Sequence, residues 1–194
     1  SAEVIQKLVV NGNNRISDET IKVYGDITFG KDYSAIDINE ILKSLYKTNF
    51  FEDVKISLSS GTLDVVVKEY AIINSIDFRG EKSLKLKKFI MKKLALKEKE
   101  SFIENKLSQD ISLIKKIYAA TGYNFIDIEA KIKKFDNDRI NLVYFLSKGK
   151  KTNISKINFI GDKKIKDKRL RDIIVSEENK FWKFISRNTF LNNN

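Results

Sequence analysis

An internal repeat runs through the 194-residue chain and is clearest around Gly80. Apolar residues stand seven, four and two positions before this glycine, and four and nine positions after it. The same five positions are apolar around Gly12 and Gly161. In chain order the three sets are Ile5, Leu8, Val10, Ile16 and Ile21; Ile73, Ile76, Phe78, Leu84 and Phe89; Ile154, Ile157, Phe159, Ile165 and Leu170. The glycines are 68 and 81 residues apart, which is too long for a solenoid repeat, so each copy should be a small domain with its own core.

Each copy is predicted to open with a strand, a turn and a helix. Residues 4–10 are mostly apolar and β-branched, with Ile5, Leu8 and Val10 at the repeated positions, and end at Asn11-Gly12, which predicts a strand that closes in a turn. Ser17 is the expected N-cap of the helix that follows, because Ile16 and Ile21 have the spacing of a hydrophobic staple around it. The same spacing recurs at Leu84 with Phe89 and at Ile165 with Leu170.

A second amphipathic helix is predicted in the first two copies. In the first copy Asp37 is the expected cap, and the apolar stripe consists of Ile38, Ile41, Leu42, Leu45 and Tyr46. In the second copy residues 101–104 have the pattern of a capping box, and the stripe consists of Ile103, Leu107, Ile111, Ile114 and Tyr118. Asn49 and Gly122 tolerate the left-handed conformation that ends many helices. Stripes of this kind typically cover a sheet.

A β-hairpin is predicted to close each complete copy. The alternating apolar residues are Val54, Ile56, Leu58, Leu63, Val65 and Val67 in the first copy, and Ile128, Ala130, Ile132, Ile140, Leu142, Tyr144 and Leu146 in the second. The turns are expected at residues 59–61 and 136–138. The predicted fold class is therefore α+β, with tandem β-α-α-β-β domains that each have a three-stranded mixed sheet and two helices on one face. Residues 150–194 repeat only the first strand and helix, so we expect an incomplete domain there.

The composition argues against catalysis. The chain has no histidine and no cysteine, so the commonest general base, the commonest metal ligand and the thiol nucleophile are missing. The carboxylate pairs Glu52-Asp53 and Asp136-Asp138 fall at a strand start and in a turn, where solvated carboxylates are ordinary. We expect no catalytic residues, no metal site and no cofactor. No apolar run reaches 18 residues, so this stretch is not expected to span a membrane as a helix.

The charge balance leaves two interpretations open. Thirty-seven Lys and Arg against 26 Asp and Glu give a net charge of +11, which is compatible with a nucleic-acid or anionic-membrane partner. A composition biased toward Lys, Ile and Asn explains the charge more simply, because many lysines fall where solvated helix faces would place them. A nucleic-acid-binding sheet should also expose aromatic residues, whereas Phe78, Phe159 and Tyr144 fall on the buried register.

The repeat resembles the polypeptide-transport-associated (POTRA) domains of the BamA family, the outer-membrane β-barrel assembly factors. The resemblance rests on the glycine-centred strand, the stapled helix, the Leu-Tyr-x-Thr-x-x-Phe-x-Asp-Val-like passage from Leu45 to Val54, and the closing hairpin. It implies a first domain at residues 3–70, a second at 71–149 and an incomplete third at 150–194. The inter-domain junctions are expected at Tyr70, Ala71, Gly149 and Lys150. Family members often have proline after the first and second hairpins, where this chain has Ala71 and Lys150.

The resemblance implies a periplasmic scaffold that is tethered to the outer membrane only through a barrel further along the full-length protein. Its expected partners are unfolded outer-membrane proteins and accessory assembly lipoproteins, and nucleic acid is not expected. Similar domains of a secretion or cell-division protein are the alternative within this class. A basic nucleic-acid-binding module is a further alternative. An enzyme that uses only carboxylates and lysines is the third class, and no residues converge to support it.

The resemblance also places the third strand of each domain at the centre of its sheet, which leaves the second strand as an edge. An exposed edge can accept an extended peptide as an added strand. The predicted peptide-binding residues are Val54, Lys55, Ile56, Ser57 and Leu58 in the first domain, and Ile128, Glu129, Ala130, Lys131, Ile132 and Lys133 in the second. We expect the charged side chains among them to face solvent, and we favour the second domain because its edge strand is longer.

Overall fold

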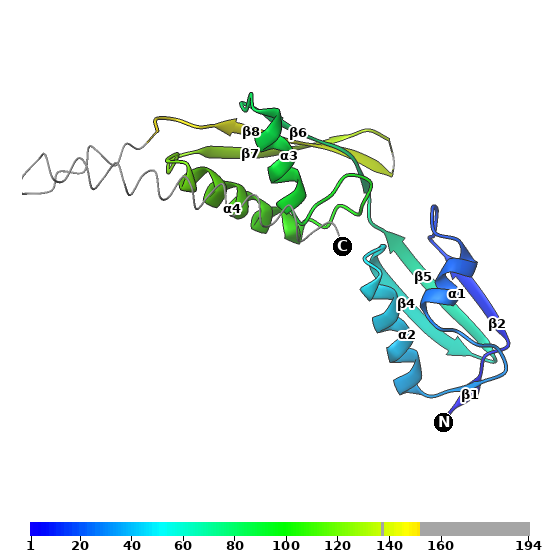
Figure 1. Ribbon diagram of the computed structural model, residues 1–194. Helices are drawn as coiled ribbons and strands as arrows, with labels where there is room; N and C mark the ends of the chain where they lie inside the picture. Colours follow the sequence, from blue (N-terminus) through cyan, green and yellow to red (C-terminus); the bar gives the residue numbers. More distant parts are fainter. Residues whose placement is uncertain (137, 152–194) are drawn as a thin grey trace, which may run out of the picture. The chain divides into compact units, whose positions relative to one another are not determined.

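The computed structural model describes residues 1–136 and 138–151 (Figure 1). Two compact units are distinguished. One comprises Ser1–Ile73 with Lys99–Ile103 and Phe135–Ile140, and the other comprises Asn74–Glu98, Glu104–Lys134 and the segment that begins at Asn141. We use "first domain" for residues 3–70 and "second domain" for residues 71–149, and these boundaries stay a prediction. The expected incomplete domain at 150–194 lies, apart from its first two residues, outside the described residues.

The first domain has a three-stranded sheet and two helices. Its elements are β1 (Glu3–Val4), β2 (Lys7–Asn11), α1 (Asp18–Tyr24), β3 (Asp32–Tyr33), α2 (Ala35–Lys47), β4 (Phe51–Ser59) and β5 (Thr62–Glu69). The sheet order is β2-β5-β4. β2 pairs with β5 in parallel and β4 pairs with β5 in antiparallel orientation. The predicted mixed sheet with the third of its strands at the centre is confirmed.

One apolar core joins both helices to the sheet. Ile21 of α1 and Leu45 of α2 are completely buried against Leu63 and Val65 of β5. The apolar positions of the predicted stripe and hairpin therefore face one another, as their spacing indicated. Tyr46 is the exception in the stripe, because 40% of it is exposed.

The opening strand is interrupted, whereas a single strand was predicted over residues 4–10. The backbone N–H groups of Gln6 and Lys7 both donate to the carbonyl oxygen of Gly61, at 2.7 and 3.1 Å. Two consecutive donors on one acceptor break the regular ladder, so the chain forms β1 and β2 with Ile5 buried between them. β1 instead pairs with β3 in a separate two-stranded sheet.

The helices of the first domain begin at short polar side chains. Ser17 caps α1, as predicted, by accepting a hydrogen bond from the Thr20 N–H at 3.1 Å. The predicted cap of α2 was one turn too late. Ser34 is the N-cap, and Asp37 is its reciprocal partner in a capping box, accepting from the Ser34 N–H at 2.8 Å. That bond holds the pKa of Asp37 below its ordinary value. Asn49 adopts the expected left-handed conformation, with φ 58°.

The second domain repeats this arrangement with longer helices. Its elements are β6 (Ile72–Arg79), α3 (Leu84–Lys93), α4 (Asn105–Ala120), β7 (Asp127–Lys134) and β8 (Arg139–Ser147), and its sheet order is β6-β8-β7. The Ile72 N–H donates to the Asp138 carbonyl at 2.8 Å, and Gly80 lies against the Leu146 carbonyl. Residue numbers thus increase together along the two strands, so β6 and β8 are parallel.

Gly12 and Gly80 occupy the same structural position. Both have positive φ angles, 87° and 93°, and a Cβ atom on either would overlap a backbone carbonyl oxygen, of Val67 for Gly12 and of Leu146 for Gly80. Glycine is required at both places because the first strand ends directly against the central strand. This close approach explains why the sequence repeat is centred on glycine.

Two local predictions for the second domain are wrong, the staple of Leu84 with Phe89 and the capping box at 101–104. Ser83 caps α3, so Leu84 is the first helical residue and is 71% exposed instead of stapling the helix. α3 begins four residues after Gly80, whereas α1 begins six residues after Gly12. This earlier start moves Leu84 off the core face. The capping box at 101–104 does not form, because Ser101 makes a β-bridge to Ile72 and α4 begins after Glu104.

Candidate functional site

At the β4 edge, alternate backbone N–H groups face away from the neighbouring strand β5. The Val54 N–H donates to the Tyr46 hydroxyl at 3.0 Å, so this N–H faces away from β5. Backbone direction alternates along a strand, and the N–H groups of Ile56 and Leu58 therefore face the same way. Among the described residues, neither of these two groups has a hydrogen bond outside the sheet. The Val54 N–H is already bonded to the Tyr46 hydroxyl. The part of the predicted edge with unbonded outward N–H groups is therefore residues 56–58.

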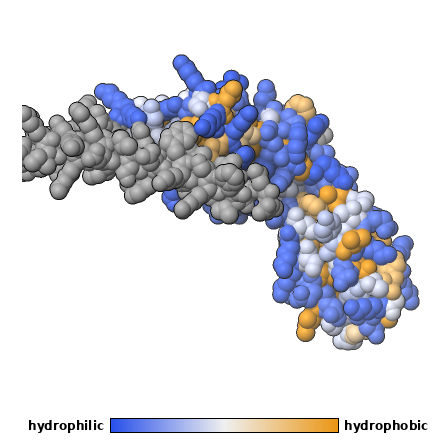
Figure 2. Space-filling model, viewed as in Figure 1, coloured by the Kyte–Doolittle hydropathy of each residue, from blue (hydrophilic) through white to orange (hydrophobic). Residues whose placement is uncertain are grey.

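An apolar groove of about 630 Å³ lies beside this open stretch, between α2 and β4. Its lining residues are Ala35, Ile36, Ile38, Asn39, Leu42, Val54, Lys55 and Ile56. Ile36 is 75% exposed although it belongs to a well-formed helix. Hydrophobic residues reach the surface of this domain among hydrophilic ones (Figure 2). A groove with apolar walls and unpaired backbone donors along one side can hold the side chains of an extended peptide.

The β7 edge has the same backbone pattern with a more polar surface. The Phe135 N–H donates to the Arg139 carbonyl at 2.8 Å, and alternation from this bond directs the N–H groups of Ile128, Ala130 and Ile132 away from β8. Glu129 and Lys131 are exposed, as predicted. Ile132 is also 45% exposed, and so are the other residues in the last half of β7. The groove described above lies at β4, and our proposal therefore centres on the first domain.

Other site types find little support among the described residues. Phe78 and Tyr144 are buried and stack with ring centroids 5.3 Å apart, as expected from their register, so they offer no exposed platform for bases. Phe159 lies outside the described residues. No cluster of three carboxylates that could hold a metal ion is present in residues 1–136 and 138–151. No described helix is both long and apolar enough to cross a bilayer.

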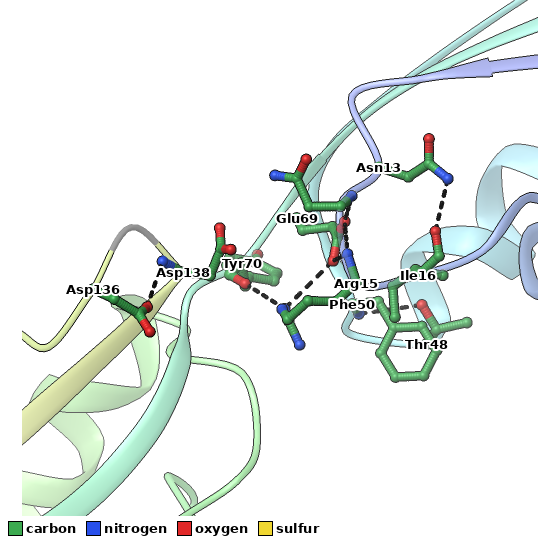
Figure 3. A network of polar contacts seen from close by, with 10 residues as sticks. Asn13, Arg15, Ile16, Thr48, Phe50, Glu69, Tyr70, Asp136 and Asp138 are labelled. Carbon is green, nitrogen blue, oxygen red and sulfur yellow. Dashed lines mark hydrogen bonds and ion pairs between the residues drawn. The ribbon is translucent and has the colours of Figure 1, made fainter.

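A buried carboxylate stabilises the end of the first domain (Figure 3). Glu69 ends β5, and its side chain is only 6% exposed. It accepts hydrogen bonds from the N–H groups of Asn14 and Arg15 and forms an ion pair with the Arg15 guanidinium at 3.5 Å. The same guanidinium donates to the Tyr70 carbonyl at 2.8 Å. The chain therefore enters the predicted junction, Tyr70 and Ala71, from a fixed strand end.

The second domain has an ion pair at the equivalent place with the charges exchanged. Lys148 follows Leu146 by two residues, as Glu69 follows Val67 in the first domain. Its ammonium group lies 2.8 Å from Glu81, whose side chain is 4% exposed. Tyr118 donates to the same carboxylate at 2.7 Å, and the Ser83 N–H donates to it at 2.9 Å. The predicted junction residues Gly149, with φ 66°, and Lys150 follow directly.

The protonation states of this cluster follow from burial and its hydrogen bonds. Burial by itself would raise the pKa of Glu81, but the hydrogen bonds from Lys148, Ser83 and Tyr118 outweigh it and lower that pKa below its ordinary value. Burial, together with the neighbouring carboxylate, raises the pKa of Tyr118 far above its usual range. Glu81 is therefore charged and Tyr118 is neutral near pH 7. Sequence reasoning missed this cluster, although the equal spacing from Val67 and Leu146 could have revealed it.

Comparison with known proteins shows which family the second domain resembles. The family model of POTRA domains, described as "Surface antigen variable number repeat", matches residues 71–149. The second domain is similar to POTRA domains over its whole length. The matched range coincides with the predicted second domain and contains the complete β6-β8-β7 sheet with α3 and α4.

Relatives extend the similarity beyond residues 71–149. The outer membrane protein assembly factor BamA of Neisseria meningitidis serogroup B is 28% identical over 191 residues, which are 97% of this chain and 24% of that protein. BamA of Neorickettsia risticii is 25% identical over 177 residues, 91% of this chain and 24% of that protein. The chain thus spans about a quarter of the length of these relatives.

The solved structures that match this chain include the N-terminal domain of Omp85 from Thermosynechococcus elongatus. That structure has a TM-score of 0.48 and 16% identity, and the match covers 74% of this chain and 63% of that one. POTRA domains 3–5 of Haemophilus influenzae BamA match with a TM-score of 0.39 and 14% identity, over 89% of this chain and 76% of that one.

Proposed function

We propose that this chain is the periplasmic POTRA region of an outer-membrane protein assembly factor, and that it binds unfolded segments of outer-membrane proteins by β-strand addition. The BamA relatives and the POTRA match support the general assignment to outer-membrane protein assembly. The single observation that carries the binding mode is the open β4 edge beside the apolar groove. In this proposal the chain is a scaffold and not an enzyme.

The β4 edge suits weak and reversible binding. Residues 56–58 offer the N–H and C=O groups of Ile56 and Leu58, so an added strand forms about four new backbone hydrogen bonds at ~1 kcal/mol net each. Side chains of the peptide that enter the groove add a hydrophobic contribution, whereas ordering a flexible peptide costs several kcal/mol. The balance corresponds to a dissociation constant between roughly 0.1 and 1 mM. Such affinity allows release of the bound segment.

Substitution of Ile36 tests the groove. Ile36→Ser removes an exposed apolar side chain from the groove wall without disturbing the core, since Ile36 is 75% exposed. We expect peptide affinity to fall about fivefold, which corresponds to ~1 kcal/mol of lost apolar contact. The measurement is a titration of labelled protein with a 10-residue peptide of alternating apolar and polar residues, followed by amide chemical shifts.

Val23→Ser provides the matched control, because Val23 is also β-branched, 74% exposed and helical, but it lies on α1 and does not line the groove. This variant should bind the peptide like the wild type. Shifts that spread over the lysines and disappear in moderate salt would refute strand addition and favour electrostatic binding. Docking of accessory assembly lipoproteins stays a prediction from the resemblance.

A further inference from the structure

The outer edge of β6 has its backbone donors occupied by the chain itself. The Ile73 N–H donates to the Glu100 carbonyl at 2.9 Å, and the Lys99 N–H donates back to the Ile73 carbonyl at 2.6 Å. Further along, the Ile76 N–H donates to the Glu98 carboxylate at 3.2 Å. The Phe78 N–H donates to the carboxylate of its neighbour Asp77 at 2.8 Å.

These donors point away from the sheet. The Ile72 N–H faces β8, since it donates to the Asp138 carbonyl, and the next residue, Ile73, therefore faces the opposite side. Ile76 and Phe78 correspond to Leu8 and Val10 by their distance from the repeated glycine. In the first domain the Lys7 N–H donates to Gly61 at the start of the parallel ladder, so the N–H groups of Leu8 and Val10 face away from β5. The repeat therefore places the N–H groups of Ile76 and Phe78 on the outer side of β6, where both bond to side-chain carboxylates. A strand that added at β6 would have to displace two main-chain bonds and two carboxylates.

The β7 edge of the same sheet lacks this protection. Within the described part of the chain, the outward N–H groups of Ile128, Ala130 and Ile132 have no hydrogen bond outside the sheet. Its nearby charged side chains Glu129 and Lys131 contact each other at 4.0 Å and do not reach these donors. An incoming strand at β7 therefore displaces no hydrogen bond that these three N–H groups make outside the sheet within residues 1–136 and 138–151.

We infer that the second domain accepts an added strand at β7 only, because the segment 98–100 and the carboxylates of Glu98 and Asp77 close β6. Unprotected sheet edges pair readily with any extended chain, so closing one edge fixes the place and number of added strands. The occupant of the open edge is an extended polypeptide, and this part of the inference rests on the proposed function. Glu98 and Asp77 act as positioning residues, since they determine which edge remains available.

Amide hydrogen exchange of the peptide-free chain tests the closed edge directly. We expect the amides of Ile73, Ile76 and Phe78 to exchange at least tenfold more slowly than those of Ile128, Ala130 and Ile132 after correction for intrinsic rates. Glu98→Ala should accelerate exchange at Ile76 severalfold, because it removes the acceptor. Glu100→Ala is the matched control, since Glu100 uses its main-chain carbonyl and not its side chain. Equal exchange at the two edges, or equal effects of the two variants, would overturn the inference.

A photo-crosslinking experiment with the peptide separates this inference from the proposed function. Benzoylphenylalanine is placed at exposed Lys131 on β7 or at exposed Arg79 on β6. We expect the peptide to be captured from position 131 in the wild type, and from position 79 only when Glu98 and Asp77 are both replaced by Ala. Capture from position 79 in the wild type would overturn the inference. Slow exchange at β6 without capture anywhere would support the closed edge and refute peptide binding by this domain.

Discussion

Lys148→Met should destabilise the second domain by an amount that depends on pH. The substitution keeps the aliphatic part of the side chain but leaves the Glu81 carboxylate, which is 4% exposed, without its cation at 2.8 Å. Breaking a fully buried pair costs about 3 to 5 kcal/mol, and an exposed pair about 0 to 1 kcal/mol. Because 29% of the Lys148 side chain is exposed, we expect an intermediate loss of about 2 kcal/mol at pH 7.

The sign of the pH dependence distinguishes charge from packing. In the wild type the folded-state pKa of Glu81 lies below its unfolded value of about 4.3, so its contribution is present above that pH and is lost as pH falls through the folded pKa. In the variant, burial without the cation should raise the folded pKa, and protonation should then favour folding as pH falls. The difference between the two proteins should therefore shrink from about 2 kcal/mol at pH 7 to well below 1 kcal/mol at pH 3.5.

Urea-dependent hydrogen exchange, measured on peptides that cover β8 (Arg139–Ser147), reports on this domain alone. Lys131→Met is a control in the same domain, because its pair with Glu129 is exposed on both sides and 4.0 Å long; it should cost less than about 0.5 kcal/mol. An equal loss for Lys148→Met at both pH values would show that the side chain contributes packing only, and would refute the electrostatic reasoning.

Two further predictions concern the cores and the turns. Leu45→Ala should lower the free energy of unfolding by about 2 to 5 kcal/mol, because Leu45 is completely buried. Lys43→Ala should leave the stability nearly unchanged, because Lys43 is exposed. Equal melting temperatures for the two variants would contradict the assigned stripe. Gly80→Ala should prevent formation of the second sheet because its Cβ would overlap the Leu146 carbonyl, whereas Gly30→Ala, at φ 82° in open space, should cost only about 1 to 2 kcal/mol. Similar far-UV circular dichroism and melting temperatures for the two glycine variants would refute the steric argument.

The repeated pattern predicted the strands, helices and their order because each depends on local periodicity. The buried positions of Leu45, Leu63 and Tyr144 follow from spacings of 3.6 or 2 residues. Helix starts were less predictable, because several side chains near a helix can cap it and tertiary contacts decide among them. Ser101 shows this, since its backbone bridges to Ile72 and the residue is lost as a cap.

The candidate edges were predictable as strands but not in their backbone direction. The sequence predicted residues 128–133 as the edge without telling which of their N–H groups face outward. The bond from Phe135 to Arg139 directs the Lys131 N–H toward β8 and the N–H groups of Ala130 and Ile132 outward. Register depends on the hairpin turn, so it could not be obtained from alternation alone. The closure of β6 by Glu98 was missed for a similar reason, because that contact joins residues 22 positions apart.

The exchanged charges at the two strand ends affect how a tandem repeat avoids folding errors. Neighbouring domains of similar topology can misfold by exchanging equivalent segments. If the loop of the second domain docked on the central strand of the first, the Glu81 carboxylate would meet the Glu69 carboxylate. In the reverse exchange Arg15 would meet Lys148. Like charges would thus oppose either exchange, whereas each native strand end pairs opposite charges.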